Sequence, residues 1–224
     1  MEVQSYREFC YTCRQPKVHC YCCYIQKFDP QIKFVILIHP IEVKRRIASG
    51  RMSHLCLDNS ELIIGHDYSQ NKNVNLILNN PNYYPVILYP GQQSTNISPL
   101  TTTQRASLFP KNKMLTIFVV DGTWNTARTM VRLSSNLHHL PKICFSPPGP
   151  SNFRVRKQPA PGCYSTLEAI HHTIELIGTT QGFNTDVRVH DRLLYVFDKM
   201  VSKQLEYVQK APRVLDRIRI KNAG

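Results

Sequence analysis

The sequence contains few acidic side chains and no long apolar segment. Its 224 residues include 15 Asp and Glu against 28 Lys and Arg, so the formal net charge is +13 and is spread along the chain. A strongly basic protein favours a polyanionic partner, nucleic acid more than an acidic membrane, although it can also be merely soluble. No apolar run reaches the length that spans a bilayer, and MEVQSYREFC lacks the apolar core of a signal peptide. We therefore expect a soluble, cytoplasmic protein with one substantial domain and no membrane partner.

Cysteine is concentrated near the start of the chain, where five of the eight lie in residues 10–23. Disulfides are rare in a reducing compartment, so another use is expected. A C-x-x-C pair and a C-x-C pair bring four thiolates from two short loops, which is typical of a structural zinc site. The expected metal ligands are Cys10, Cys13, Cys20 and Cys22.

Two alternatives to this zinc site stay open. His19 or Cys23 can replace the fourth ligand, and the thiols can be free or redox-active without a metal. The other cysteines, Cys56, Cys144 and Cys163, are expected to be ordinary buried residues.

Short apolar runs separated by polar or helical segments predict an α/β protein with a mostly parallel sheet. Buried strands are predicted at residues 32–40, 61–65, 84–91 and 114–121. Between them we expect a short helix around the basic turn 44–46, an Asn-rich loop at 70–83 and a Ser/Thr-rich linker at 93–106.

Polar or turn-forming residues follow three of these predicted strands. Ligands of such sheets bind where the carboxyl ends of the strands lead into loops. That rule selects His39-Pro40, Tyr89-Pro90-Gly91 and Asp121-Gly122-Thr123-Trp124.

Helices are predicted after two of the later segments. From Trp124 onward the apolar residues recur at helical spacing, and Thr123 or Asp121 is a suitable N-cap. On this pattern alone Asp121 is more often a cap than a catalyst, and Trp124 more often core. Ser165 and Glu168 form a capping-box pattern at the start of a second helix.

Basic residues surround that second helix start and the end of the chain. Arg154, Arg156 and Lys157 lie just before Ser165, and a helix N-terminus beside cations suits a carboxylate or a phosphate. Residues 199–221 predict a basic helix and tail, either an RNA-facing surface or a solvated helix face.

These motifs together resemble the DTW-domain family. Asp121-x-Thr123-Trp124 followed by Ala127-Arg128 resembles the signature that names the family. Ser49-Gly50 departs from the Thr-Gly pair that the family often shows. Further matches occur in the family's order at the Cys cluster, His39-Pro40-x-Glu42, Leu88-Tyr89-Pro90, Arg154-x-Arg156-Lys157 and Ser165-Thr166-Leu167-Glu168-Ala169.

The resemblance implies a tRNA-uridine aminocarboxypropyltransferase, and the compact length suggests the bacterial type. Such enzymes transfer the 3-amino-3-carboxypropyl group of S-adenosylmethionine to N3 of a tRNA uridine, here expected in the variable loop, and release methylthioadenosine. The implied fold is SPOUT-like with a knotted C-terminal region. We expect a Cys-rich zinc-binding segment at 1–30 and a catalytic domain with a basic C-terminal helix and tail at 31–224. No obligate protein partner is evident, and the oligomeric state is left open.

This reaction needs a base, because N3 of uridine is a poor nucleophile until its proton leaves. Asp121, at the end of a buried strand, is the first candidate, since desolvation can raise the pKa of a carboxyl group; His39 is the reserve. Donor contacts are expected from Tyr89, Pro90, Thr123, Trp124, Arg154, Ser165, Thr166 and Glu168. RNA contacts are expected from Lys44, Arg45, Arg46, Arg128, Arg156 and Lys157. The alternatives are a zinc-dependent RNA-binding module and a SPOUT-type RNA methyltransferase.

Overall fold

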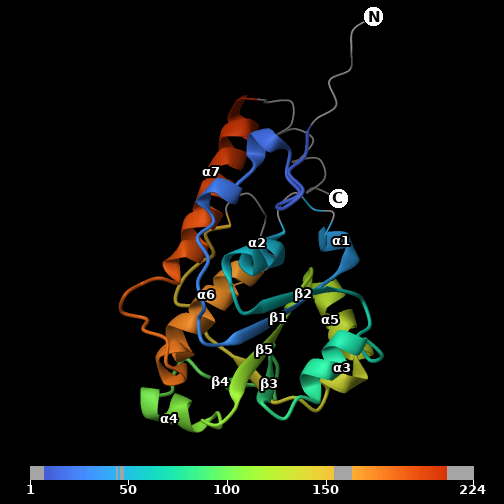
Figure 1. Cartoon of the computed structure of the whole chain (residues 1–224), viewed down its shortest axis with the longest axis vertical. Coiled ribbons are helices and arrows are strands. Elements are labelled where there is room, and N and C mark those ends of the chain that lie inside the picture. The colour runs from blue at the N-terminus through green and yellow to red at the C-terminus, as the bar shows by residue number, and fades with distance from the viewer. Residues whose placement is uncertain (1–7, 44, 46–47, 154–162, 211–224) are drawn as a thin grey trace, which may run out of the picture.

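The computed structural model describes residues 8–43, 45, 48–153 and 163–210, with side chains up to residue 206. In these residues six strands form one sheet in the order β2-β1-β5-β3-β6-β4, and every neighbouring pair is parallel (Figure 1). The chain therefore has the predicted α/β class with a parallel sheet. The strands are β1 Lys33–Ile38, β2 Ser60–Ile64, β3 Tyr83–Leu88, β4 Thr95–Asn96, β5 Met114–Asp121 and β6 Lys142–Cys144.

Helices cover both faces of this sheet. The α-helices of the described residues are α1 Pro40–Val43, α2 Ser49–Cys56, α3 Lys72–Leu78, α4 Thr102–Ser107, α5 Trp124–Leu133, α6 Thr166–Ile177 and α7 Asp191–Lys210. Short 3₁₀ helices are η1 Lys17–His19, η2 Cys22–Tyr24, η3 Ser135–Leu137 and η4 Gly178–Gln181. None of the described helices combines the length and the apolar composition that a membrane span needs.

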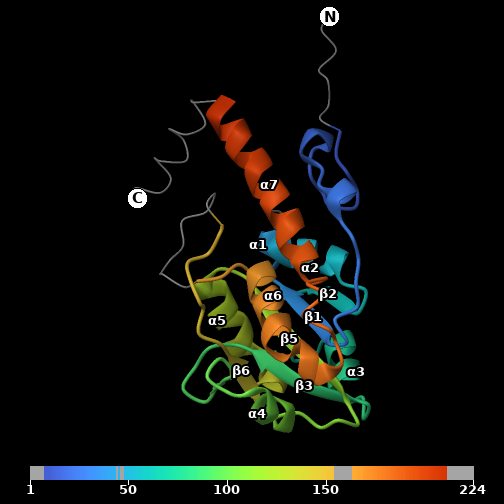
Figure 2. The same ribbon diagram turned by 90° about the vertical axis from the view of Figure 1, so that its left-hand side faces the viewer.

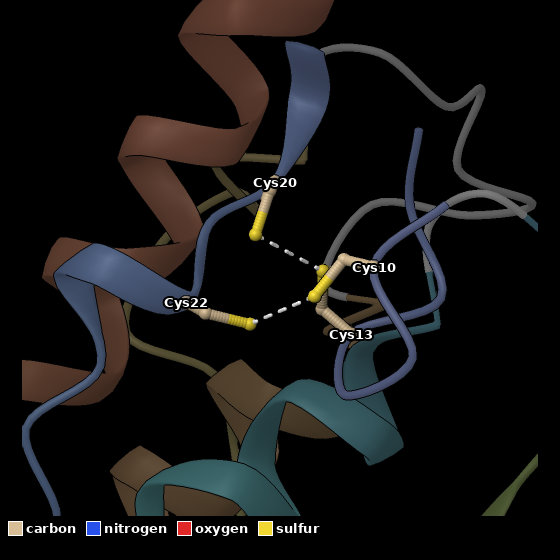
Figure 3. Close-up of side chains that lie close together, drawn as sticks. All are labelled: Cys10, Cys13, Cys20 and Cys22. Carbon is tan, nitrogen blue, oxygen red and sulfur yellow. Dashed lines mark hydrogen bonds between the residues drawn. The ribbon is translucent and has the colours of Figure 1, made fainter. Parts of the chain in front are cut away.

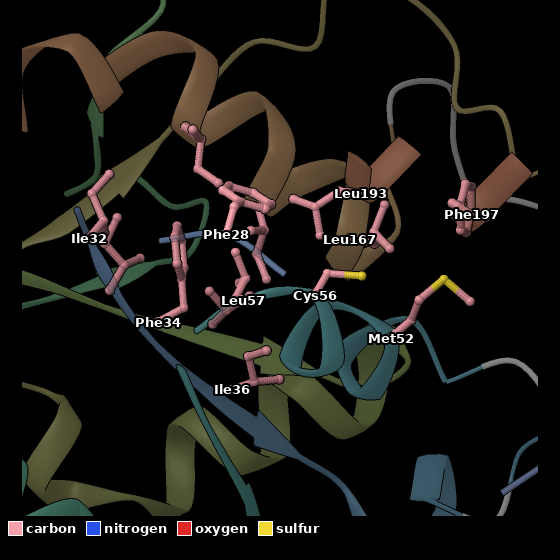
Figure 4. Close-up of a cluster of buried hydrophobic side chains, with 14 of the residues drawn as sticks. Phe28, Ile32, Phe34, Ile36, Met52, Cys56, Leu57, Leu167, Leu193 and Phe197 are labelled. Atoms are coloured by element: carbon pink, nitrogen blue, oxygen red, sulfur yellow. The ribbon is translucent and has the colours of Figure 1, made fainter. Parts of the chain in front are cut away.

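Side chains along the central strands point alternately to the two faces of the sheet, and this produces the two layers of the hydrophobic core. In β1, Phe34 and Ile36 face the cluster that contains α2, α6 and α7, whereas Val35 and Leu37 face the cluster with α3 and α5. Side chains in a strand point alternately to opposite faces, so a strand buried on both faces must be apolar throughout. Figure 4 shows part of the larger cluster, to which Phe34 and Ile36 of β1 and Leu167 of α6 all belong.

The strongly apolar strands and the two capped helices were predicted correctly. β1, β2, β3 and β5 lie at the predicted runs, α5 follows Asp121 with Thr123 as its cap, and Ser165 caps α6. The predicted helix around 44–46 is displaced, since α1 ends before these residues and α2 begins after them.

Two predicted loops are wrong, and the two short strands β4 and β6 were missed. The Asn-rich segment 70–83 contains α3, which Asn71 caps and whose Val74 and Ile77 are buried against the sheet. The linker 93–106 contains β4 and α4, and Thr101 caps α4 through a capping box. β6 is three residues long and has too short an apolar run to stand out.

The Cys-rich segment lies beside α7 (Figure 2). Its Cys13 and Tyr21 are buried in the larger core cluster, together with Phe197 of α7. Lys203 of α7 donates a hydrogen bond from Nζ to the carbonyl of Cys20 at 3.1 Å. These contacts fix the segment against the helix, while the predicted boundary at residue 30 stays a prediction.

Candidate active site and metal centre

The carboxyl ends of three adjacent strands bring the predicted loop residues together. In the register of the sheet, Ile38 of β1 pairs with Asp121 of β5, and Leu88 of β3 pairs with Val119. His39 extends this ladder, because its backbone N–H donates to the carbonyl of Asp121 at 3.0 Å. His39, Asp121 and the Tyr89 loop consequently meet at one edge, as parallel pairing requires.

The Asp121 carboxylate is buried and held by two helix starts. The residue is 6 % exposed. Its Oδ1 accepts a hydrogen bond from Thr166 Oγ1 at 2.6 Å, and its Oδ2 accepts one from the Gly50 N–H at 3.2 Å. Thr166 is the first residue of α6 and Gly50 the second of α2, so one carboxylate joins β5 to both helices.

Gly50 is a site residue that sequence reasoning did not select. A Cβ at this position would lie 2.4 Å from Asp121 Oδ2, so only glycine permits the close approach. The one sequence signal was the Ser49-Gly50 pair, noted only as a departure from the family's Thr-Gly pair and without a role.

Gly50 is followed in α2 by a buried arginine. This residue, Arg51, donates from Nη2 to the carbonyl of Val43 at 2.9 Å. Burial lowers the pKa of Arg51, and its attraction to Asp121 opposes that lowering. The attraction to Asp121 thus favours the charged form of the buried Arg51.

A pocket of about 390 Å³ opens beside Asp121. Val120 and Gly122, the neighbours of Asp121 in the chain, line it together with Thr166, and Ala127 of α5 closes one side. Its aromatic lining comes from loops after three strands and from the segment before α6: Tyr89, Trp124, Phe145 and Tyr164. Pro90, Cys144 and Cys163 also line it.

Trp124 belongs to this pocket more than to the core. Its side chain is 44 % exposed, and its Nε1 donates toward Cys163 Sγ at 3.3 Å. An indole at a pocket wall offers a flat apolar face to a ring, whereas a core anchor would be buried. Cys163 and Cys144 are half-buried at this pocket, so only Cys56 is fully buried as expected.

Three predicted site residues also have local structural roles. Thr123 Oγ1 accepts from the Thr126 N–H at 3.2 Å and caps α5. Ser165 and Glu168 form the predicted capping box of α6. Glu168 additionally accepts hydrogen bonds from Ser151 Oγ and the Asn152 N–H, so its carboxylate ties the segment before α6 to the helix start.

His39 is a neutral acceptor at this edge of the sheet. Its Nδ1 accepts from the Ile41 N–H at 3.2 Å, and its ring meets His66 edge-on with the centroids 5.8 Å apart. Burial, with a smaller contribution from His66, lowers the pKa of His39.

The predicted RNA contacts are only partly within the described residues. Arg128 is exposed on α5, and Arg45 is exposed with its Nε 3.3 Å from Glu42 Oε1. The other predicted RNA contacts, Lys44, Arg46, Arg156 and Lys157, lie outside the described residues, as does the predicted donor contact Arg154.

The four expected zinc ligands converge at the Cys-rich segment (Figure 3). The sulfur atoms of Cys10 and Cys22 lie 3.6 Å apart, as do those of Cys13 and Cys20, and all four lie within 4.8 Å of one another. A tetrahedral site with Zn–S bonds of 2.3 Å separates its sulfur atoms by about 3.8 Å. The four cysteines therefore fit a zinc ion, and Cys23 is exposed outside the cluster.

The thiols of this cluster differ in acidity. The backbone N–H of Cys13 lowers the pKa of the Cys10 thiol, whereas burial raises the pKa of Cys13 and of Cys22. A metal binds thiolates, so binding here would release protons.

Comparison with protein families matches residues 7–205 to the DTW domain. The chain belongs to the DTW-domain family. In this DTW domain the three residues of the signature have different positions: Asp121 is buried under α6, Thr123 caps α5, and Trp124 lines the pocket.

Curated relatives of this DTW domain come from animals. The chain is 30 % identical over 169 residues to tRNA-uridine aminocarboxypropyltransferase 2 of Drosophila melanogaster, which covers 72 % of this chain and 63 % of the relative. The protein of the same name from Mus musculus is 30 % identical over 167 residues, and that from Macaca fascicularis is 26 % identical over 172. These two matches cover 72 % and 75 % of this chain and 54 % and 56 % of the relatives. The chain thus spans somewhat more than half the length of these relatives. No solved structure matches it.

Proposed function

We propose that this DTW domain transfers the 3-amino-3-carboxypropyl group of S-adenosylmethionine to N3 of a tRNA uridine. Relatives named tRNA-uridine aminocarboxypropyltransferase 2 and the net charge of +13 support the proposal. The proposal includes a uridine of the tRNA variable loop, a cytoplasmic location and the knotted SPOUT-like C-terminal region. The observation that carries it is the aromatic-lined pocket beside the buried Asp121, whose carboxylate the start of α6 holds in place.

The pocket fits a nucleoside donor. Its volume of about 390 Å³ lies in the range of small-molecule sites. Tyr89, Trp124 and Tyr164 offer aromatic faces to adenine or to a flipped uracil. The α6 N-terminus beside Thr166 directs its positive end to this edge, which suits the carboxylate of the donor, with Arg154 as a further holder.

Asp121 is the proposed base. Its Oδ1 accepts a hydrogen bond from Thr166 Oγ1 and its Oδ2 accepts one from the Gly50 N–H, so the carboxylate has a fixed position at the end of β5. The N3 proton of uridine passes to Asp121, and the N3 electron pair attacks the γ-carbon of the donor's amino-acid arm. The carbon–sulfur bond breaks with its electrons on sulfur, which releases methylthioadenosine. Zinc at the cysteines has no part in these steps.

A labelled-donor assay tests this function against its alternatives. Purified protein is incubated with unmodified tRNA and S-adenosylmethionine labelled at either the carboxyl or the methyl group. Carboxyl label in tRNA supports the proposal, methyl label indicates an RNA methyltransferase, and tRNA binding with neither label indicates a zinc-dependent RNA-binding module.

Variants assign the base. Asp121→Asn should reduce transfer by at least about 100-fold with tRNA affinity nearly unchanged, whereas Asp58→Asn, at an exposed carboxylate, should be as active as wild type. Full activity of Asp121→Asn would show that Asp121 is not the base, and His39 would then be the next candidate.

Thr166 positions Asp121 in this account. Thr166→Val removes the 2.6 Å hydrogen bond at nearly constant volume and should lower kcat about tenfold or more. Thr166→Ser keeps the hydroxyl group and should recover most of the rate. Equal rates for the valine and serine variants would exclude this positioning role.

A further inference from the structure

We infer that four side chains at the junction of α6 and α7 form a second metal site: His171, Glu175, His190 and Asp191. His171, His190 and Asp191 each bring one ligand atom within 4.8 Å of the others, and Glu175 contacts His190. None of the four lines the pocket beside Asp121. The site is therefore separate from the proposed active site and independent of the proposed function.

The fold places these side chains as two facing pairs. His171 and Glu175 are four residues apart on α6, hence on one face of the helix, and His190 and Asp191 stand at the start of α7. His171 Nε2 lies 2.8 Å from Asp191 Oδ1, and His190 Nε2 lies 2.5 Å from Glu175 Oε2. The two imidazole rings stack with centroids 4.8 Å apart, so the two pairs lie side by side.

The spacing and the donor set suit a borderline divalent ion such as Zn²⁺ or Co²⁺. Imidazole nitrogen and carboxylate oxygen bind zinc at about 2.0–2.2 Å, which puts ligand atoms of a tetrahedral site roughly 3.4 Å apart. The nitrogen–oxygen separations of 2.5 and 2.8 Å within the pairs and of 3.9 Å between His190 Nε2 and Asp191 Oδ1 bracket that value. His190 is fully buried, whereas the Glu175 and Asp191 side chains are 35 % and 43 % exposed. An ion can therefore enter from the carboxylate side against imidazoles that the core already holds in place.

Arg188 is the competing cation. Its guanidinium donates to Glu175 at 2.6 and 2.7 Å and to Asp191 at 2.8 and 3.0 Å. The side chain is 47 % exposed and can turn to solvent when an ion arrives. Arg188 also distinguishes the metal site from a plain network of ion pairs. Removing it strengthens metal binding if the four side chains are ligands, and only weakens the fold if they are not.

Such an ion would join α6 to α7. α6 begins beside Asp121, and α7 packs against the Cys-rich segment, so the ion would fix two helices that connect the pocket to the zinc ligands. Its role is structural, with no open position needed for chemistry.

Metal stoichiometry of the full chain tests this inference. Protein freed of metal with a chelator is dialysed against Zn²⁺, and bound zinc is measured by mass spectrometry. Wild type should bind two equivalents, Cys10→Ser and His171→Gln one each, and the double variant none. The control His139→Gln, at an exposed histidine, should bind two. One equivalent in wild type, or two in His171→Gln, would overturn the inference.

The variant Arg188→Gln provides a second, independent test of the metal site. It should tighten the second zinc equivalent about tenfold in a calorimetric titration, because a nearby positive charge is removed. Unchanged or weaker binding overturns the inference, even where His171→Gln fails to fold. Cobalt gives a spectroscopic readout: the ion lost in His171→Gln should lack the sulfur-to-metal charge-transfer absorption of the cysteine site.

Discussion

At the scale of single residues, the central feature is the carboxylate of Asp121. Its burial and its two helix-derived hydrogen bonds give it a fixed position at the pocket edge. In the proposed mechanism, the hydrogen bond from Thr166 holds in place the carboxylate that would take the proton of the substrate. Variants that move the carboxylate without removing it are therefore informative.

Gly50→Ala is such a variant. Its new methyl group would lie 2.4 Å from Asp121 Oδ2 and 3.0 Å from Ile36 Cγ2, so the carboxylate must shift. We expect a loss of transfer of roughly 100-fold and a loss of about 1–3 kcal/mol of unfolding free energy. The matched control is Gly149→Ala, where an added methyl group meets nothing within 4 Å. Transfer kinetics and chemical denaturation check both. Similar transfer activity of Gly50→Ala and Gly149→Ala would show that the close approach of Gly50 to Asp121 is not needed for transfer.

At the scale of elements, two helices begin with the same capping box but in different places. Ser165 caps α6 at the pocket, and Thr101 caps α4 away from it. Ser165→Ala and Thr101→Ala should each cost about 1 kcal/mol of stability. Only Ser165→Ala should also reduce transfer, because the start of α6 holds Thr166 against Asp121. Thermal melting and transfer rates measure the two effects, and equal activity of both variants would contradict the role given to α6.

The strands and helices that were predicted correctly are those with a clear local signal in the sequence, either a long apolar run or a capping pattern. β1 and β5 are long apolar runs, and Ser165 with Glu168 is a local capping signal. α3 was missed because its asparagines disfavour a helix, and its stability comes from burying Val74 and Ile77 against the sheet.

The candidate site divides in the same way. The strand-end rule selected His39, Tyr89 and Asp121 from their places in the chain. Gly50 and Asp121 are 71 positions apart in the sequence, and no local sequence pattern predicts a contact between residues so far apart. Folding also brings Cys22, and not the exposed Cys23, into the group of four cysteines that could hold a metal ion.

At the scale of the whole molecule, the Cys-rich segment joins the start of the described chain to α7. Cys10→Ser should lower the zinc content and cost at least about 2 kcal/mol, roughly 4–8 °C in melting temperature. Cys23→Ser, at the exposed neighbour, should leave both unchanged. Metal analysis and thermal melting test this pair. Undiminished zinc at the cysteine site in Cys10→Ser, or a loss in Cys23→Ser, would contradict the ligand set.

The excess of positive charge predicts strongly salt-dependent tRNA binding. Each phosphate contact adds to the slope of log affinity against log salt concentration. Arg128→Gln, on α5 at the pocket end of the sheet, should reduce that slope by about 1. Lys111 lies before β5, at the opposite end of the strand, so Lys111→Gln should leave the slope unchanged. Filter binding over a range of salt concentrations measures the slope for each variant. Equal slopes for Arg128→Gln and Lys111→Gln would show that the tRNA does not contact Arg128.

The most direct test of the central claim is nucleoside mass spectrometry of tRNA treated with the purified protein and S-adenosylmethionine. We predict a uridine that carries an aminocarboxypropyl group on N3 after treatment with wild type, and unmodified uridine after treatment with Asp121→Asn. A methylated nucleoside, or the same aminocarboxypropyl product from both proteins, would contradict the account of this site.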